Sequence, residues 1–202
     1  MGNLWKGFKE HRTFRFTSLL VILLIALVVL APVIAPYNPL EAVMKDANQA
    51  PSMAHLFGTD KLGRDVLSRI LYGGAYSLSS VLALVAIIFC VGTFLGLVAG
   101  YFGGLIDTVI MRVADMMISF PGVILAIAIA GIMGGSLVNA MIALTAVTWT
   151  KYARLSRSMV LKIRKRDFVD AAIVSGGTSS HILWTHIMPN VVPILVITAV
   201  SD

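Results

Sequence analysis

Two acidic residues recur at helical spacing within a mostly apolar part of the chain. Asp107, Met111 and Asp115 are four residues apart, and Arg112 lies three residues before Asp115. Residues four apart share one face of a helix, and charged side chains at membrane depth are costly and often functional. The simpler interpretation is an intramembrane ion pair of Arg112 and Asp115 that fixes the inner end of a helix. The sharper one is a proton relay, which would make the protein an ion-gradient-driven secondary transporter.

Other kinds of chemistry leave no signature. The sequence holds no G-x-x-x-x-G-K-[ST] phosphate loop and no G-x-S-x-G nucleophile motif. Its single cysteine, Cys90, can form no disulfide within the chain. The histidines have no metal-ligand spacing; they are His11, His55, His181 and His186. We therefore expect no catalytic residue, no metal site and no cofactor in this chain.

The most informative segment is DFVDAAIVSGGT, residues 167–178. Asp170 and the two alanines after it, followed by Gly176 and Gly177, indicate a short helix that stops at a residue able to take positive φ. A second short helix is expected from about Thr178 to residue 188. Two short helices that expose small residues at their junction form a projection suited to a groove on a partner protein.

The composition requires lipid around the chain. Of 202 residues, 58% are hydrophobic and 13% are charged, whereas soluble domains carry about 25% charged residues. The surplus apolar surface must face hydrocarbon. The formal charge of +6 lies beside apolar segments rather than among exposed aromatics, so it indicates membrane topology and not nucleic-acid binding.

Apolar segments of spanning length define the expected organisation. A cytoplasmic tail over 1–17 precedes a first transmembrane helix over 18–36 and an extracytoplasmic loop over 37–76 with a short amphipathic helix near 65–72. A core over 77–202 follows, with spans near 77–100, 105–134 and 136–150. The last apolar run, 191–200, is too short to cross about 30 Å of hydrocarbon. The basic tail would also suit a cleaved signal peptide, but the apolar part exceeds the usual ~7–15 residues.

Glycine and proline mark two features of these spans. Gly92, Gly96 and Gly100 recur at intervals of four, which lets helix backbones approach closely in lipid. Pro121 divides the third span, because proline frees a backbone carbonyl that only protein or a watery cavity can satisfy. We expect helix packing at the glycines and a pore-lining kink at Pro121.

Lysine and arginine counts predict the orientation. The amino-terminal tail holds four of these residues before residue 18, and the segment 151–166 holds seven. Cytoplasmic segments carry the excess of Lys and Arg, so both are expected inside, with four spans between them.

Several motifs together resemble one family. The order of an acidic residue, two alanines, a glycine and a later His-Ile-x-Pro-Asn is similar to the cytoplasmic coupling loop of binding-protein-dependent ABC importer permeases. The resemblance extends to the C-type subunits of the peptide/nickel branch and covers nearly the whole chain from residue 14. It is carried by His55 to Asp65, Ser68-Arg69, Ala99 to Gly104, Asp107, Met111-Arg112, Phe120-Pro121 and Tyr152 to Leu155.

The resemblance implies an all-α, polytopic ABC type I importer transmembrane domain in the bacterial plasma membrane, its amino terminus cytoplasmic. About five of an expected six helices are present. Its implied partners are a homologous second permease, two ABC ATPase subunits that hold ATP and Mg²⁺, and an extracellular solute-binding protein. Within a coupling loop over 164–189, the implied ATPase-coupling residues are Asp170, Ala171, Ala172, Gly176 and Gly177. Asp170 stands where the family usually has glutamate, which keeps the charge.

The substrate is less legible. Di- or oligopeptides and chelated nickel both stay open, although residues 111–116 and 149–151 are somewhat more similar to nickel-type members. The rival classes are an ion-gradient-driven secondary transporter and a membrane scaffold without transport. A nucleotide-binding subunit that co-purifies with the chain would favour the importer, and proton-coupled flux by the chain alone would favour the secondary transporter.

Overall fold

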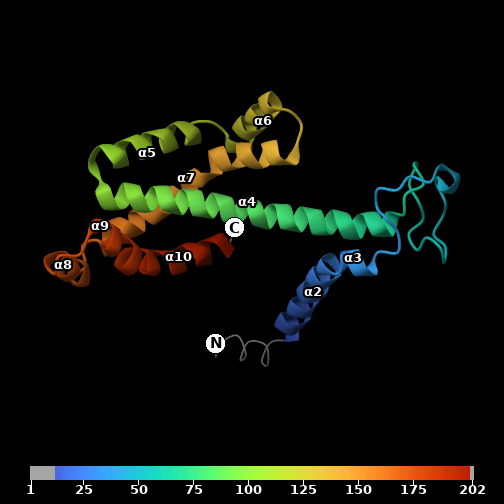
Figure 1. Cartoon of the computed structure of the whole chain (residues 1–202), viewed down its shortest axis with the longest axis horizontal. Helices are drawn as coiled ribbons and strands as arrows, with labels where there is room; N and C mark the ends of the chain where they lie inside the picture. Colours follow the sequence, from blue (N-terminus) through green and yellow to red (C-terminus); the bar gives the residue numbers. More distant parts are fainter. Residues whose placement is uncertain (1–11, 201–202) are drawn as a thin grey trace. The chain divides into compact units, whose positions relative to one another are not determined.

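The computed structural model describes residues 12–200, and all regular structure in that range is helical (Figure 1). Extended backbone pairs there only at an isolated bridge between Thr59 and Asp65. The expected all-α class is confirmed. The elements are α2 (Arg12–Val29), α3 (Ala31–Ile34), the 3-10 helix η1 (Met44–Asp46), α4 (Val66–Phe102), α5 (Gly104–Ile118), α6 (Gly122–Met133), α7 (Leu137–Ile163), α8 (Asp167–Val174), α9 (Ser179–His181), the π-helix η2 (Ile182–Ile187) and α10 (Met188–Val200).

The chain divides into two compact units, Met1–Val81 and Leu82–Asp202, each described by itself. In the first unit, α2 is apolar and buries none of its residues. A helix that is apolar all round and exposed needs lipid around it. It begins at Arg12, so part of the expected tail over 1–17 is already helical. Residues 1–11, with Lys6, Lys9 and His11, lie outside the described part.

Helix α4 starts earlier than the expected second span. Its 37 residues correspond to about 55 Å, well beyond the hydrocarbon thickness of about 30 Å. The amphipathic helix expected near 65–72 is therefore not a separate element, because its residues form the first turns of α4. Gly73 and Gly74 lower helix propensity, but α4 continues through them.

The third expected span is two helices, not one. Helices α5 and α6 are bent by 93° at the break between Ile118 and Gly122. Pro121 caps α6, and its carbonyl accepts the hydrogen bond from Leu125 N at 3.1 Å. Proline disfavours helical backbone in the residue before it and has no N–H to donate, so the chain breaks there instead of bending gently.

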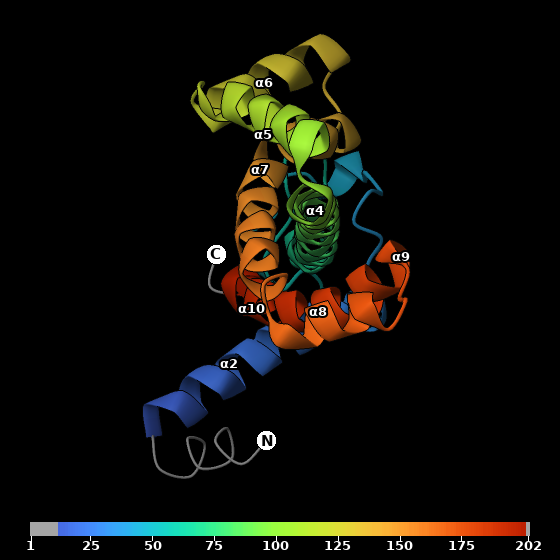
Figure 2. The same cartoon turned by 90° about the vertical axis from the view of Figure 1, so that its left-hand side faces the viewer.

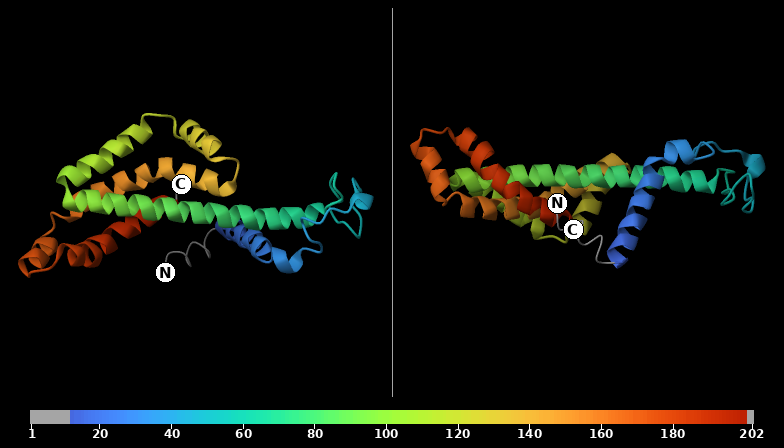
Figure 3. Two further views of the ribbon diagram at one scale, coloured as in Figure 1. Left: turned by 45° about the horizontal axis from the view of Figure 1, so that its top comes forward. Right: turned by 90° about the horizontal axis from the view of Figure 1, so that it is seen from below.

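Helix α7 contacts α4, α5, α6 and α10. Figures 1 and 2 show it alongside the carboxyl-terminal part of α4, with α5 and α6 against another side. The turn between α4 and α5 lies at the same end of the unit as α8 and α9 (Figure 3). At that end, Arg164 after α7 donates a hydrogen bond to the carbonyl of Tyr101 at 2.8 Å.

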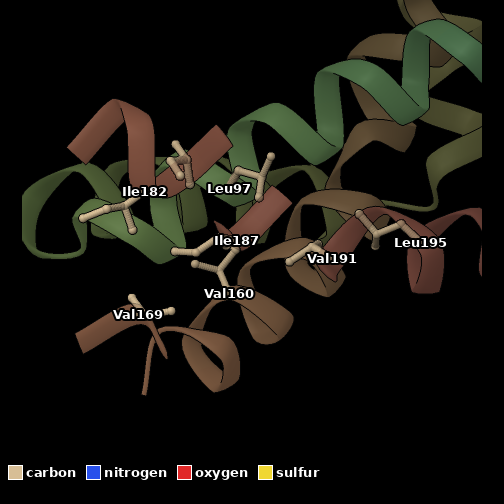
Figure 4. Close-up of a cluster of buried hydrophobic side chains, with 8 residues drawn as sticks. Leu97, Val160, Val169, Ile182, Ile187, Val191 and Leu195 are labelled. Atoms are coloured by element: carbon tan, nitrogen blue, oxygen red, sulfur yellow. The ribbon is translucent and has the colours of Figure 1, made fainter. Parts of the chain in front are cut away.

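A buried apolar cluster joins these elements near α8. Val169 of α8 belongs to the same cluster as Val160 of α7 and Leu97 of α4, each at most 2% exposed (Figure 4). Full burial of such a side chain contributes about 1.5–3 kcal/mol. The cluster thereby anchors α8 to the membrane helices. Its remaining members are Ile182, Leu183, Ile187, Val191 and Leu195.

Helices α9, η2 and α10 follow one another without a break, so residues 179–200 form one helical run. With 22 residues and a mean hydropathy of 1.6, this run is long and apolar enough to cross a membrane. The expectation that the last span is too short is therefore wrong, because the helix begins at Ser179 instead of near Val191. The second short helix expected after Gly177 is the start of this span.

Three helices of the described range qualify as membrane spans by length and composition: α2, α4 and the run 179–200. The bent pair of α5 and α6 brings the number to four if the two helices make one span. Helix α7 is long enough, with 27 residues, but its last half carries several basic residues.

Candidate functional site

The glycines of α4 lie directly against α7. A Cβ at Gly92 would come within 2.5 Å of the Trp149 carbonyl, and one at Gly100 within 2.8 Å of Val160 Cβ. At Gly96 it would overlap the carbonyl oxygen of Ala153. The contact predicted from the glycine spacing is therefore present, and its partner is α7. Because the contacts advance in the same order along both helices, α4 and α7 run parallel.

A buried hydrogen bond accompanies this close approach. Ser156 of α7 donates its hydroxyl to the carbonyl of Thr93 at 3.1 Å, and Ser156 is fully buried. Small side chains allow the two helix backbones to approach closely. At this short distance, a side chain of one helix can reach the backbone of the other. Helix α7 is held to α4 along three turns.

Two ion pairs attach α5 to α7. Asp107 accepts two hydrogen bonds from Arg157, Nε to Oδ1 and Nη2 to Oδ2, both at 2.5 Å. Asp115 accepts one from Arg154 Nη2, also at 2.5 Å. We expected Arg112 to pair with Asp115, but the arginine that pairs with it is Arg154. Spacing within one helix cannot reveal a partner 39 residues away on another.

Helix α8 presents one face outward and one inward. Val169 is fully buried, and Ala172 packs partly against the apolar cluster. On the outer face, Asp170 and Ala171 are exposed. Exposed apolar side chains surround them: Phe168 at 44%, Ile173 at 50% and Val174 at 88%. An exposed apolar patch rimmed by charge is typical of an interaction surface.

The two glycines after α8 have different structural roles. Gly176 has a φ of +79° and nothing within 4 Å of an added Cβ. A Cβ at Gly177 would come within 2.8 Å of the Ala172 carbonyl and 3.3 Å of Ile182. Gly176 therefore permits the turn, while Gly177 permits close packing. Thr178 caps the next helix, α9, because its hydroxyl accepts the N–H of His181 at 3.3 Å.

A polar network organises the loop of the first unit, which sequence reasoning missed. Asp65 is 3% exposed and accepts the Ser68 N–H and hydroxyl, both at 2.8 Å. Its other oxygen lies 3.1 Å from His55 Nδ1, and the ring of Tyr37 stacks on that histidine at 4.7 Å. An aspartate three residues before a serine, ahead of an apolar run, is a helix-start signal that could have revealed this hub.

Asp60 is a second anchor of the same loop. It accepts the N–H groups of Leu62 and Arg64 at 2.8 and 3.0 Å, and it pairs with the guanidinium groups of Arg64 and Arg69. Desolvation by itself would raise the pKa of Asp60. The hydrogen bonds from Arg64 and Leu62 lower the pKa by more than desolvation raises it, so the pKa lies well below its usual range.

Burial likewise raises the pKa of Asp65, while the hydrogen bonds from Ser68 and His55 lower it more, so its net pKa is below the usual value. Both carboxylates, Asp60 and Asp65, are thus held in their charged form by the folded loop.

No group of three or more metal-ligating side chains occurs within residues 12–200. Cys90 is a free, exposed thiol. The expectation that this chain carries no cofactor stays a prediction, as does a pore-lining role for Pro121.

Comparison with known proteins decides the family. Residues 92–202 match the family described as binding-protein-dependent transport system inner membrane component. The chain belongs to this family. Residues 1–51 match the N-terminal transmembrane domain of oligopeptide transport permease C, so the resemblance to C-type permeases is confirmed.

Several relatives match this permease over almost its whole length. The dipeptide transport system permease DppC of Haemophilus influenzae is 36% identical and matches 96% of the chain and 68% of its own length. The glutathione transport permease GsiD of Pectobacterium atrosepticum is 37% identical, over 96% of the chain and 64% of its own length. The probable D,D-dipeptide permease DdpC of Escherichia coli is 36% identical, over 92% and 62%. The chain spans about two thirds of the length of these relatives.

Proposed function

We propose that this chain is a permease subunit of an ATP-driven importer of di- or oligopeptides in a bacterial plasma membrane. It would form half of the translocation pathway and pair with a second, homologous permease. Two separate ATPase subunits would supply the energy, and an extracytoplasmic solute-binding protein would deliver the substrate.

The observation that carries this proposal is the 36–37% identity, over more than nine tenths of the chain, to permeases named for dipeptide and glutathione transport. Peptides are favoured over nickel because these names share a small peptide as cargo. The motif likeness of residues 111–116 and 149–151 to nickel-type members is the weaker indication, and nickel serves as the competing substrate in the test.

The outer face of α8 is the surface best suited to an ATPase. Asp170 and Ala171 are exposed on it, among Phe168, Ile173 and Val174. The opposite face is anchored through Val169 to α7 and α4. A helix that is free on one side and fixed on the other transmits displacement of a partner into the membrane helices. Among the implied coupling residues, Ala172 and Gly177 would act through packing within this chain.

An ion-gradient-driven transporter is the weaker alternative. A proton relay through Asp107 and Asp115 needs carboxylates that can take up protons. Each carboxylate is instead engaged by an arginine of α7, so both acidic residues are accounted for as contacts between α5 and α7.

The test is ATP-dependent uptake by the complete permease reconstituted with its partner subunits and binding protein. Uptake of a radiolabelled dipeptide that requires ATP supports the proposal. Uptake driven by a proton gradient without ATP, or uptake of chelated nickel but not of peptide, would overturn it.

A second experiment addresses α8. Ala171→Trp should lower uptake and co-purification of the ATPase about fivefold or more, because forcing a bulky side chain into a packed contact typically costs about 1–3 kcal/mol. The matched control is Leu105→Trp, at an 84% exposed position near the same end of the unit, which should leave both unchanged. Equal behaviour of the two variants would remove α8 from the interface.

A further inference from the structure

An open cavity of about 410 Å³ lies between α5 and α7, lined by Met111, Asp115, Arg154 and Arg157. Its volume falls within the roughly 300–1,000 Å³ of small-molecule sites. The lining combines a carboxylate, two guanidinium groups and one flexible apolar side chain. Such a lining suits a ligand with charges of both signs.

The charged lining is too exposed to face lipid. The side chains of Asp115 and Arg154 are 52% and 46% exposed, yet both belong to helices of the transmembrane core. Charged groups at membrane depth face a watery cavity or a polar protein surface, because contact with hydrocarbon is costly. This face of α5 and α7 therefore borders water or polar protein rather than lipid.

The two ion pairs at this cavity differ in strength. Arg157 holds Asp107 through two hydrogen bonds, and Asp107 is 18% exposed. Arg154 donates one hydrogen bond to Asp115, and both side chains are about half exposed. Exposed single-contact pairs contribute little to stability, whereas bidentate pairs are stronger. The Asp107–Arg157 pair therefore holds the two helices together, whereas the Asp115–Arg154 pair can exchange partners.

The spacing along the helices leaves room for that exchange. Asp107 and Asp115 are eight residues apart, or about 12 Å along α5, whereas Arg154 and Arg157 are three residues, or about 4.5 Å, apart along α7. The two arginines lie within one turn of α7, but the carboxylates that they bind, Asp107 and Asp115, lie about two turns apart on α5. The two arginine side chains therefore point in different directions along α5. Met111, which lies midway between the two aspartates along α5, lines the cavity together with Asp115 and both arginines.

We propose that this cavity is a low-affinity station for the charged ends of a translocating peptide. Asp115 receives the terminal ammonium group, Arg154 receives the terminal carboxylate, and Met111 contacts the peptide between them. Each end replaces half of the ion pair between Asp115 and Arg154, so every charge stays paired. This assignment rests on the proposed peptide-import function and deepens it.

Weak binding is what a pathway requires. A ligand must enter readily and leave readily, so a strong site would slow transport. Exchange of one half-exposed ion pair for two others satisfies this condition. The arrangement also favours a zwitterion over a ligand of one sign, because the four groups Asp107, Asp115, Arg154 and Arg157 sum to no net charge.

The test is protection of a cysteine placed in the cavity. Cys90→Ser removes the exposed native thiol, and Met111→Cys then introduces one into the cavity lining. The rate of thiol modification is measured in the detergent-solubilised complex of cysteine-free partner subunits, with dipeptide added directly. Binding-protein selectivity then plays no part. Val109→Cys, at a 60% exposed position of α5 outside the cavity lining, is the matched control.

A free dipeptide at about four times its dissociation constant should slow modification at Met111→Cys about fivefold, following 1 + [L]/Kd. The same dipeptide with acetylated and amidated ends should not protect, and Val109→Cys should be unaffected by either. Arg154→Gln should abolish the protection, whereas Arg112→Gln, on α5 but not in the cavity lining, should retain it.

Protection by the blocked peptide equal to that by the free one, or no protection by either, would overturn the station. If the parent complex still imports dipeptide, the proposed function survives that result. If the parent complex imports no peptide, both inferences fail together.

Discussion

Adjacent glycines illustrate how two identical residues can have different roles. Gly176 adopts φ +79° in open space, whereas Gly177 has no positive φ but lies against Ala172 and Ile182. The first is constrained by backbone conformation and the second by volume.

Substitutions at Gly176 and Gly177 should therefore change the stability of the protein in different ways. Gly176→Ala should cost about 1–2 kcal/mol from left-handed strain, and Gly176→Asn less, because asparagine tolerates that region. Gly177→Ala should cost about 1–3 kcal/mol through overpacking, and Gly177→Asn should be worse still. Thermal unfolding of the purified permease measures these differences. The interpretation would be wrong if asparagine were tolerated better at 177 than at 176.

The carboxylate of Asp65 makes loop stability depend on pH. Its native pKa is below the ordinary value of 3.8, so the native loop binds this proton less readily than the unfolded chain does. The contribution is complete above about pH 3.8 and declines as pH falls through the lower native pKa. The loop should therefore lose protection at strongly acidic pH and stay intact between pH 5 and 8.

Asp65→Asn provides the matching test at neutral pH. The variant loses the charged acceptor of three hydrogen bonds, so the amides near Ser68 and Tyr37 should become about 1–3 kcal/mol less protected. Hydrogen exchange measures that protection. Glu41→Gln, at an exposed position of the same loop, is the control, and an equal loss there would contradict the role of Asp65.

At the scale of elements, α7 holds the second unit together by three different kinds of contact. Backbone proximity at glycines joins it to α4, and charged side chains join it to α5. The apolar cluster then connects its end to α8 and to the run 179–200. Helix α8 therefore shares one buried cluster with α7, α4 and the run 179–200.

The α4–α7 contact should be sensitive to a single methyl group. Gly96→Ala places a Cβ onto the Ala153 carbonyl and should destabilise the protein by about 1–3 kcal/mol. Gly73→Ala, on the same helix with nothing within 4 Å, should be neutral or stabilising by about 0.5–1 kcal/mol. Melting temperatures in detergent compare them directly, and an equal effect of both would show that close packing at Gly96 contributes nothing.

At the scale of the molecule, the orientation inferred from basic residues remains a prediction. The loop with His55 should be outside and the α8 segment inside, because the excess of Lys and Arg flanks α8. In a Cys90→Ser background, Ser175→Cys should react with an impermeant thiol reagent only after the cells are opened, and Ser52→Cys should react in intact cells. Reaction of Ser175→Cys in intact cells would invert the topology and remove the proposed coupling to a cytoplasmic ATPase.

The sequence by itself determined the fold class, the family and the glycine contact face. Lipid exposure requires a surplus of apolar residues, and close helix packing requires small residues at fixed intervals, so both are written in composition and local spacing. Helix limits were less accessible. Helix α4 includes the residues that were expected to form a separate amphipathic helix, and residues 179–200 form one continuous helical run. In both places the backbone hydrogen bonds continue through small or polar residues.

Only the tertiary structure decided which distant side chains meet. Arg154 replaced Arg112 as the partner of Asp115, and His55, Ser68 and Tyr37 gathered around Asp65. These pairings join residues up to 50 positions apart, as with Asp107 and Arg157. The sequence shows each charge, but the partner of a charge depends on which helices pack together, and that is set by the sum of many contacts across the fold.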